Sequence, residues 1–284
     1  MAGVSTKEIK SRIRSLESTK QITKAMEMVA SSKLRRAQMQ IAGSRPYFEI
    51  LYSTIQDIAC SNQDFASPYL APDTAQSKKT AFVVIAGDRG MAGGYNSNII
   101  KLCQAEMQGK DAVILPIGKK ACDYFKSRNA EFFSDYYVDA SDVSVGNCFS
   151  LAKNLCRAYL AGEFDEIRVI YTEFVSVLSQ APRCKKLLPL SVGDDAASGT
   201  SDILYEPGCK EVFDAIIPEY IGGVIYGALC ESRTSEHAAR RMAMDSAGKN
   251  ATAMIDDLTL KYNRARQGAI TQEITEIVAG AGAQ

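Results

Sequence analysis

The chain has 284 residues, enough to bury a core in one large domain or two smaller ones. Lys plus Arg and Asp plus Glu number 33 each, so the net charge gives no reason to expect a nucleic acid or an anionic membrane as the partner. One histidine and eight scattered cysteines without a C-x-x-C pair leave little material for a His-based catalytic centre or a metal site. We therefore expect no cofactor and no metal.

Residues 1–59 are expected to form one long helix. Apolar residues recur at spacings of three and four, on one stripe and then, with a shift of face, on a second: Ile9, Ile13 and Leu16, then Met26, Ala30, Leu34, Ala37 and Ile41. An uninterrupted helix of this length is about 80 Å long, at a rise of 1.5 Å per residue. Two shorter helices, broken near 43–46 where Pro46 stands, are the alternative.

The same segment is strongly basic. Residues 1–45 carry ten basic and three acidic side chains, an excess of seven positive charges in a neutral protein. This excess indicates an acidic partner along the helix. A nucleic acid is the weaker interpretation, because residues 1–46 contain none of the aromatic side chains on which bases commonly stack.

Residues 76–190 show the sequence pattern of a small α/β domain, with strand-like and helix-compatible segments in alternation. Three apolar, β-branched runs are typical of buried parallel strands: 80–86, 112–117 and 167–172. Helix-compatible segments lie between and around them: 95–108, 118–128 and 146–162. This alternation predicts a mostly parallel sheet covered by helices.

Residues 209–284 are again helix-compatible, with a weak point expected at Pro218 and Gly222-Gly223. A stripe with steps of three and four predicts a coiled-coil face: Met254, Leu258, Tyr262, Ala265 and Ala269. About 70 helical residues would extend roughly 105 Å, which points to an extended element. The fold we predict is α/β: a long antiparallel coiled coil of the N- and C-terminal helices, with an inserted Rossmann-like α/β domain.

A glycine-rich turn, residues 87–94, follows the first predicted strand, where a dinucleotide-binding protein places its phosphate-binding loop. Its spacing, G-x-x-G-x-x-G-G, departs from G-x-G-x-x-G, and no Lys-Ser/Thr pair follows. We interpret it as a tight strand-to-helix turn that exposes Asp88 and Arg89. His237 is expected on a helix surface, and the adjacent Asp256 and Asp257 point in different directions, so neither predicts a catalytic centre.

Two long motifs make the chain similar to a known family. Residues 22–30 (ITKAMEMVA) with Ser32-Lys33, and residues 262–267 (YNRARQ) followed by 270–277 (ITQEITEI), resemble the terminal signatures of the γ subunit of F-type ATP synthases, bacterial type. Asp88-Arg89-Gly90 with Gly93-Gly94 and Asn96 is similar to the family's first strand-loop, and 204–207 (LYEP) to its foot region. The resemblance extends from about residue 3 to 280.

This resemblance implies a rotor rather than an enzyme. In the family, the terminal helices enter the α3β3 hexamer, the α/β domain forms the foot beside ε and the c ring, and catalysis belongs to the β subunits. The chain would thus couple ion-driven rotation to ATP synthesis, or to hydrolysis in reverse, without a cofactor of its own. Its expected location is the cytoplasmic face of the cell membrane, as a peripheral protein that reaches the membrane only through the c ring.

The resemblance also assigns residues by position. Contacts with the β subunits that carry torque are expected at Lys24, Met26, Lys33, Arg266, Gln267, Thr271 and Glu273. Tyr205 and Glu206 are expected to meet the c ring, and Asp88, Arg89 and Gly90 to form the foot-domain turn. The small residues 279–284 would form a smooth tip that turns within the hexamer.

Two other functions remain open from the residues alone. One is an α/β nucleotide-binding enzyme whose helical arms dimerise, suggested by the glycine-rich turn. The other is a coiled-coil nucleic-acid binder, suggested by the basic first helix. The predicted division is 1–59 for the N-terminal coiled-coil helix, 76–190 for the α/β foot and 209–284 for the C-terminal helix.

Overall fold

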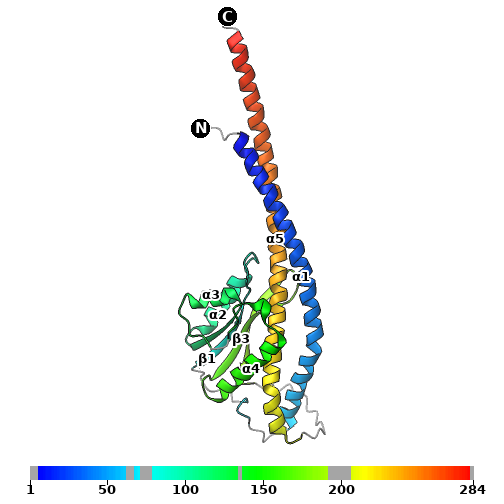
Figure 1. Ribbon diagram of the computed structural model, residues 1–284, viewed down its shortest axis with the longest axis vertical. Helices are drawn as coiled ribbons and strands as arrows, with labels where there is room; N and C mark the ends of the chain where they lie inside the picture. Colours follow the sequence, from blue (N-terminus) through cyan, green and yellow to red (C-terminus); the bar gives the residue numbers. More distant parts are fainter. Residues whose placement is uncertain (1–5, 62–66, 71–78, 134–135, 191–205, 282–284) are drawn as a thin grey trace. The chain divides into compact units, whose positions relative to one another are not determined.

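The computed structural model describes residues 6–61, 67–70, 79–133, 136–190 and 206–281 (Figure 1). The chain divides into two compact units. The helical unit contains residues 1–31 and 240–284, and the sheet unit contains residues 32–239. Both terminal helices pass through both units.

The terminal helices are α1, Thr6–Ser61, and α5, Cys209–Ala281. Each is a single helix, and α1 continues through Pro46 while α5 continues through Pro218. The alternative of two shorter N-terminal helices is therefore wrong. Packing along both helices stabilises them enough to tolerate a proline whose ring removes one backbone hydrogen bond.

In the helical unit, α1 and α5 run antiparallel along a seam with heptad spacing. Ile9 and Ala30 of α1 and Ala251 of α5 are buried in it. Thr23 is also buried, 8% exposed, and the α5 backbone approaches it so closely that a Cβ added to Gly248 would lie 3.6 Å from its hydroxyl. The polar residue at a seam position joins the two predicted apolar stripes into one.

The seam corrects two expected core positions. Met26 is only half-buried, because the side chain of Glu27, 18% exposed, takes the neighbouring seam position. Met254 is 54% exposed, and Ile255 replaces it in the seam. Hydrophobicity alone misplaced both, since a heptad step of three or four residues selects a position whatever the chemistry of its side chain.

The sheet unit contains four strands in the order β2-β1-β3-β4. Their bounds are Lys79–Ile85 for β1, Asp111–Ile117 for β2, Glu166–Phe174 for β3 and Gln180–Leu188 for β4. The first three are parallel and match the predicted runs, whereas β4 pairs antiparallel with β3 and was not predicted. Its sequence, QAPRCKKLL, lacks an apolar run because only its last two residues, Leu187 and Leu188, are buried.

Helices cover both faces of the sheet (Figure 1). The connecting helices are α2, Tyr95–Met107, α3, Lys119–Lys126, and α4, Val145–Leu160, with a short 3₁₀ segment, η1, at Ala140–Asp142. Side chains of α2 and α3 share one core with Phe82 and Ile114, and those of α4 and α5 share the other with Val83 and Leu115. Alternate strand residues thus point to opposite layers.

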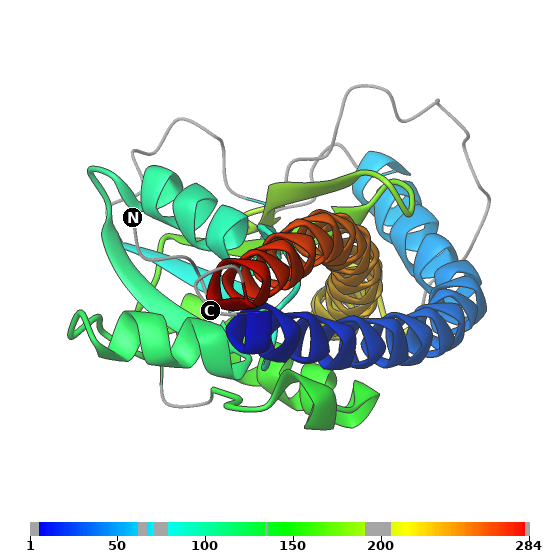
Figure 2. The same cartoon turned by 90° about the horizontal axis from the view of Figure 1, so that it is seen from above.

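The helix α5 packs closely on α4. A Cβ added to Gly222 would lie 2.5 Å from Phe149 Cδ1 and 3.0 Å from its Cα, so only glycine fits this crossing. Within the sheet unit, the end of α1 and the first part of α5 lie beside the sheet and share its core, as the view from above shows (Figure 2). One segment of α5 has the length and composition of a membrane-spanning helix, with a mean hydropathy of 1.3. Half of this segment is buried inside the protein, as in the core helix of a globular domain.

Candidate functional site

The glycine-rich turn is held together by the carboxylate of Asp88. Its Oδ1 accepts hydrogen bonds from the backbone N–H groups of Ala140 at 2.7 Å and Lys119 at 3.2 Å, and its Oδ2 accepts one from Ser141 at 3.1 Å. These donors open the helices η1 and α3, whose free N–H groups favour an anion. Asp88 is therefore half-buried and not exposed as expected, while Arg89 and Gly90 are exposed.

Close backbone approach fixes the rest of the turn. Asn96 accepts from the backbone N–H of Gly87 at 2.9 Å and donates to the carbonyl of Arg89 at 3.2 Å. Gly118 has φ +102°, and a Cβ added to it would lie 2.1 Å from the carbonyl oxygen of Ala86. Only glycine adopts this conformation without strain. These contacts hold the turn after β1 against the segment that follows β2.

The crevice where an open α/β sheet binds its ligand lies outside the carboxyl ends of the strands, where the strand order reverses. Here that point lies between β1 and β3. Serine hydroxyls of α5 bond the backbone of Thr172 near the end of β3, and the Glu236 carboxylate lies against Gly87 after β1. Side chains of α5 thus pack against the strand ends at this point, while the Asp88 carboxylate binds the starts of α3 and η1.

Most cysteines in the part of the chain whose side chains are described are core residues, whereas Cys184 and Cys209 are half-buried. Five are buried: Cys103, Cys122, Cys148, Cys156 and Cys230. Burial raises the pKa of each of these thiols, to about 12 for Cys103 and to about 11 for Cys122. A thiol is a nucleophile only as the thiolate, so the environment makes them unreactive. His237 is half-buried, not on the surface as predicted.

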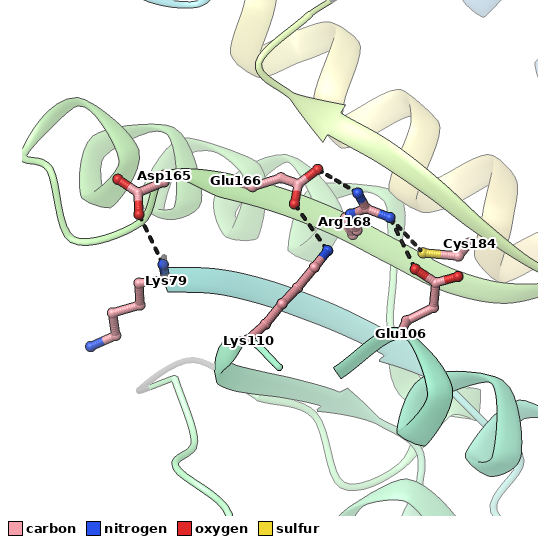
Figure 3. A network of polar contacts seen from close by, with 7 residues as sticks. All are labelled: Lys79, Glu106, Lys110, Asp165, Glu166, Arg168 and Cys184. Carbon is pink, nitrogen blue, oxygen red and sulfur yellow. Dashed lines mark hydrogen bonds and ion pairs between the residues drawn. The ribbon is translucent and has the colours of Figure 1, made fainter. Parts of the chain in front are cut away.

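A charged network on the sheet centres on Glu166 and Arg168 of β3 (Figure 3). Glu166 contacts the guanidinium of Arg168 at 2.8 Å and the ammonium of Lys110 at 3.4 Å, and Arg168 also contacts Glu106 at 3.0 Å. Burial alone would raise the pKa of Glu166, but the hydrogen bonds and charges of Arg168 and Lys110 lower it overall. The carboxylate is ion-paired on both oxygens, so this network stabilises the fold and offers no general base.

Two of the three α1 residues that are predicted to contact β subunits, Lys24 and Lys33, are exposed. Lys24 is exposed and pairs with Glu27 at 2.9 Å, and Lys33 is exposed, whereas Met26 is half-buried. In the helical unit, Lys24 also lines a shallow groove between the two helices, which is formed by Glu17, Lys20, Gln21, Lys24, Ala25, Met28 and Ile255. Large apolar side chains are exposed on the same stretch of α1: Ile22, Met28 and Val29. Such a surface is typical of a protein interface.

The predicted β-contact residues of α5 are all exposed. Every residue from 266 to 279 is solvent-exposed, including Arg266, Gln267, Thr271 and Glu273. The hydroxyl of Thr271 donates to the carbonyl of Gln267, at 2.9 Å. Four large apolar side chains are 47–65% exposed here: Ile270, Ile274, Ile277 and Val278. This end of α5 therefore presents an apolar and charged surface that its own chain does not cover.

The structure describes only some of the residues that are predicted to contact the c ring and to form the tip. Glu206 is exposed, and Tyr205 lies outside the described residues. In the tip, Ala279 and Ala281 are exposed, and 282–284 also lie outside the described residues.

Sequence reasoning missed the polar residues of α5 that bind the sheet. Ser232, Thr234 and Ser235 are at most 1% exposed, and Ser232 and Ser235 bond the backbone of Thr172 in β3. A cluster of small hydroxyl residues between Cys230 and Ala238 was a usable signal, because buried hydroxyls require hydrogen-bond partners.

Comparison with known sequences gives consistent matches over the whole chain. A protein family described as "ATP synthase" matches residues 5–283. The ATP synthase gamma chain of Alkaliphilus metalliredigens is 45% identical over 288 residues, which cover 99% of both chains. The gamma chain of Ruminococcus albus is 42% identical, with 95% of this chain covered, and the sodium ion specific gamma chain of Acetobacterium woodii is 40% identical, with 97% covered.

Solved structures show the same fold at much lower sequence identity. A chain of the Euglena gracilis mitochondrial ATP synthase (OSCP/F1/c-ring) has a TM-score of 0.68 at 19% identity, covering 98% of this chain and 94% of its own. A chain of the Tetrahymena thermophila enzyme, from its central stalk and c-ring, has a TM-score of 0.62 at 22% identity, covering 80% of this chain and 99% of its own. These likenesses concern the fold.

Proposed function

Because the chain belongs to the family of ATP synthase gamma chains, we propose that it is the central rotor shaft of an F-type ATP synthase. The observation that carries this function is the exposed end of α5. Residues 266–279 form a regular helix that places four large apolar side chains in solvent. An apolar helical surface of this kind requires a surrounding protein, and the α3β3 hexamer is the partner proposed for it.

The shaft acts by shape and charge. As α5 turns, its sides present different groups to three surrounding β subunits, so each site meets Arg266 and Glu273 at a different stage. The exposed Lys24 and Lys33 of α1 attract acidic loops of β, with Met26 beside them. Gln267 and Thr271 complete the proposed contact surface on α5. Binding these groups in turn favours different conformations of each β subunit, which is how rotation is coupled to catalysis.

The chain itself is proposed to be non-catalytic. Two observations support this proposal: the Asp88 carboxylate is bound by the backbone at the starts of α3 and η1, and serine side chains of α5 bond the end of β3 near the point where an open α/β sheet binds its ligand. The five buried thiols are unreactive because their pKa values are raised. ATP chemistry is therefore assigned to the β subunits.

The remaining contacts follow from the division into shaft and foot. We propose residues 1–59 and 209–284 as the shaft and 76–190 as the foot, with Tyr205 and Glu206 near the c ring and the ε subunit beside the foot. The complex would lie at the cytoplasmic face of the cell membrane. The chain reaches the membrane through the c ring.

Reconstitution tests this function. Purified α and β subunits should form a complex with steady ATPase activity only when the full chain is added, and a fluorescent bead on the foot should rotate when ATP is supplied. The chain alone should neither bind nor hydrolyse ATP. ATP binding by the isolated chain in calorimetry, together with no complex formation, would support the enzyme alternative instead.

A further inference from the structure

Two serine side chains of α5 bind the carboxyl edge of the sheet, and an arginine between them binds the η1 segment. We name Ser232, Arg233 and Ser235 the α5 clamp. The hydroxyl of Ser232 accepts from the backbone N–H of Thr172 at 3.0 Å, and that of Ser235 donates to the carbonyl of Thr172 at 3.2 Å. Thr172 lies two residues beyond Ile170, where the pairing of β3 with β1 ends. The helix thus satisfies both backbone groups of one strand residue.

The third residue of the clamp reaches another segment. The guanidinium of Arg233 donates from Nη2 to the carbonyl oxygens of Ala140 and, at 3.0 Å, Val143. The N–H groups of Ala140 and Ser141 in the same segment are bound by Asp88. The η1 segment is therefore held from both sides, by a carboxylate of the β1 turn and by a guanidinium of α5, and it links the two.

The clamp differs in kind from the rest of the contact between α5 and the sheet. Most other buried α5 side chains there are apolar, among them Ile217, Ile221, Ile225 and Leu229, and the buried Thr234 bonds within α5 to the carbonyl of Cys230. Apolar packing favours burial without a strong directional preference, so it resists rotation of the helix about its own axis only through shape. Hydrogen bonds weaken steeply when their angles change, and three clamp residues with four such bonds resist that rotation directly.

We propose that the α5 clamp locks the α/β domain to α5 against rotation, so that torque applied to the domain enters the helix without slip. This inference rests on the proposed rotor function. The clamp residues are positioning residues, because they act through α5 and not on ATP or on the coupling ion. Their contribution matters most when the rotor works against a load, since an unloaded shaft transmits little torque through the contact.

The test uses the complete ATP synthase in sealed vesicles, with Arg233→Gln and, separately, Ser232→Ala with Ser235→Ala. The matched control is Lys153→Gln, which removes an exposed ion pair between α4 and Glu219 of α5. Ion pumping and ATP hydrolysis are measured together, with and without an opposing ion gradient. In both clamp variants we expect near-normal hydrolysis, but ions pumped per ATP should fall about threefold under load, and less without it. The control should pump normally.

The outcomes separate the two proposals. A clamp variant that assembles and pumps normally against the gradient overturns the clamp and leaves the rotor function intact. Should Arg233→Gln prevent assembly, the serine pair decides, because alanine is well tolerated in a helix and removes only the bonds to Thr172. Failure of the unaltered chain to join α and β would instead refute the rotor function. Restored coupling with Arg233→Lys, which keeps a donor, would further support the clamp.

Discussion

At the scale of single residues, one carboxylate holds together the loops at the carboxyl edge of the sheet. Asp88 accepts three backbone N–H groups from the starts of α3 and η1. In a dinucleotide-binding protein, the phosphate binds at the N-terminus of the helix that directly follows the glycine-rich turn, and in this chain that helix is α2. Asp88 instead binds the backbone of two later segments, so its role in the turn is structural.

Replacing this carboxylate should destabilise the sheet unit. Asp88→Asn puts an amide donor where Oδ2 now accepts from the N–H of Ser141, so two donors face each other. We expect a loss of about 2 kcal/mol in the free energy of unfolding, measured by urea denaturation of the full chain. The exposed Asp123→Asn is the control and should change stability by less than about 0.5 kcal/mol. Equal effects in the two variants would contradict the anchoring role of Asp88.

Glu166 makes stability depend on pH. Its pKa is lowered in the folded protein, so its contribution is complete well above the ordinary value of 4.5 and is lost as the pH falls through the lower folded value. Glu166→Gln should cost about 2 kcal/mol at neutral pH, by breaking the pair with Arg168. The difference between wild type and variant should shrink below pH 4.5. Chemical denaturation from pH 3 to 7 measures it, and a constant difference over that range would refute the assignment.

At the scale of elements, α5 combines two kinds of surface in one continuous helix. Near its start it is buried between the sheet and other helices, with Phe213 and Leu229 fully enclosed, whereas every residue from 266 to 279 is exposed. The apolar residues near the start of α5 form part of a core, whereas those near its end are exposed to solvent. Burial distinguishes them, since the residue types are similar.

The crossing of α4 and α5 gives a prediction with a matched control in the same helix. Gly222→Ala should destabilise the protein by about 2 kcal/mol, because the new methyl group meets Phe149, whose backbone atoms cannot move aside easily. Gly227→Ala has open space around the new methyl group and should stabilise by about 0.5 kcal/mol through helix propensity. Thermal unfolding of both variants measures the contrast. The same sign for the two changes would show that packing at residue 222 is not limiting.

At the scale of the whole molecule, the proposed function predicts residues that matter for coupling but not for folding. Arg266 is exposed and stands on the uncovered end of α5. Arg266→Ala should alter the free energy of unfolding of the isolated chain by less than about 0.5 kcal/mol. In the assembled complex it should lower the rate of ATP synthesis by about fivefold, through lost contact with β. Asn250→Ala, an exposed change lower on the same helix, is the control and should leave synthesis unchanged.

The sequence by itself determined much of this protein. The spacing of Ile9, Ile13 and Leu16 predicted a long helix, and three apolar runs predicted the parallel strands, because periodicity is a local property of the chain. The terminal motifs indicated the family, which the comparisons confirmed. The predicted contact residues, such as Arg266, are exposed, and their contacts with the β subunits remain a proposal.

Only the tertiary structure decided the rest. The edge strand β4 has no apolar run, the seam position of Thr23 is polar, and the helix passes Pro46 without ending. Each of these features depends on which distant segment of the chain packs beside it. The local spacing of apolar residues does not specify that segment. The clearest case is the bond of Arg233 to the carbonyl of Val143, 90 residues away in sequence. A hydrogen bond needs a partner in space, and only folding brings that partner to the helix.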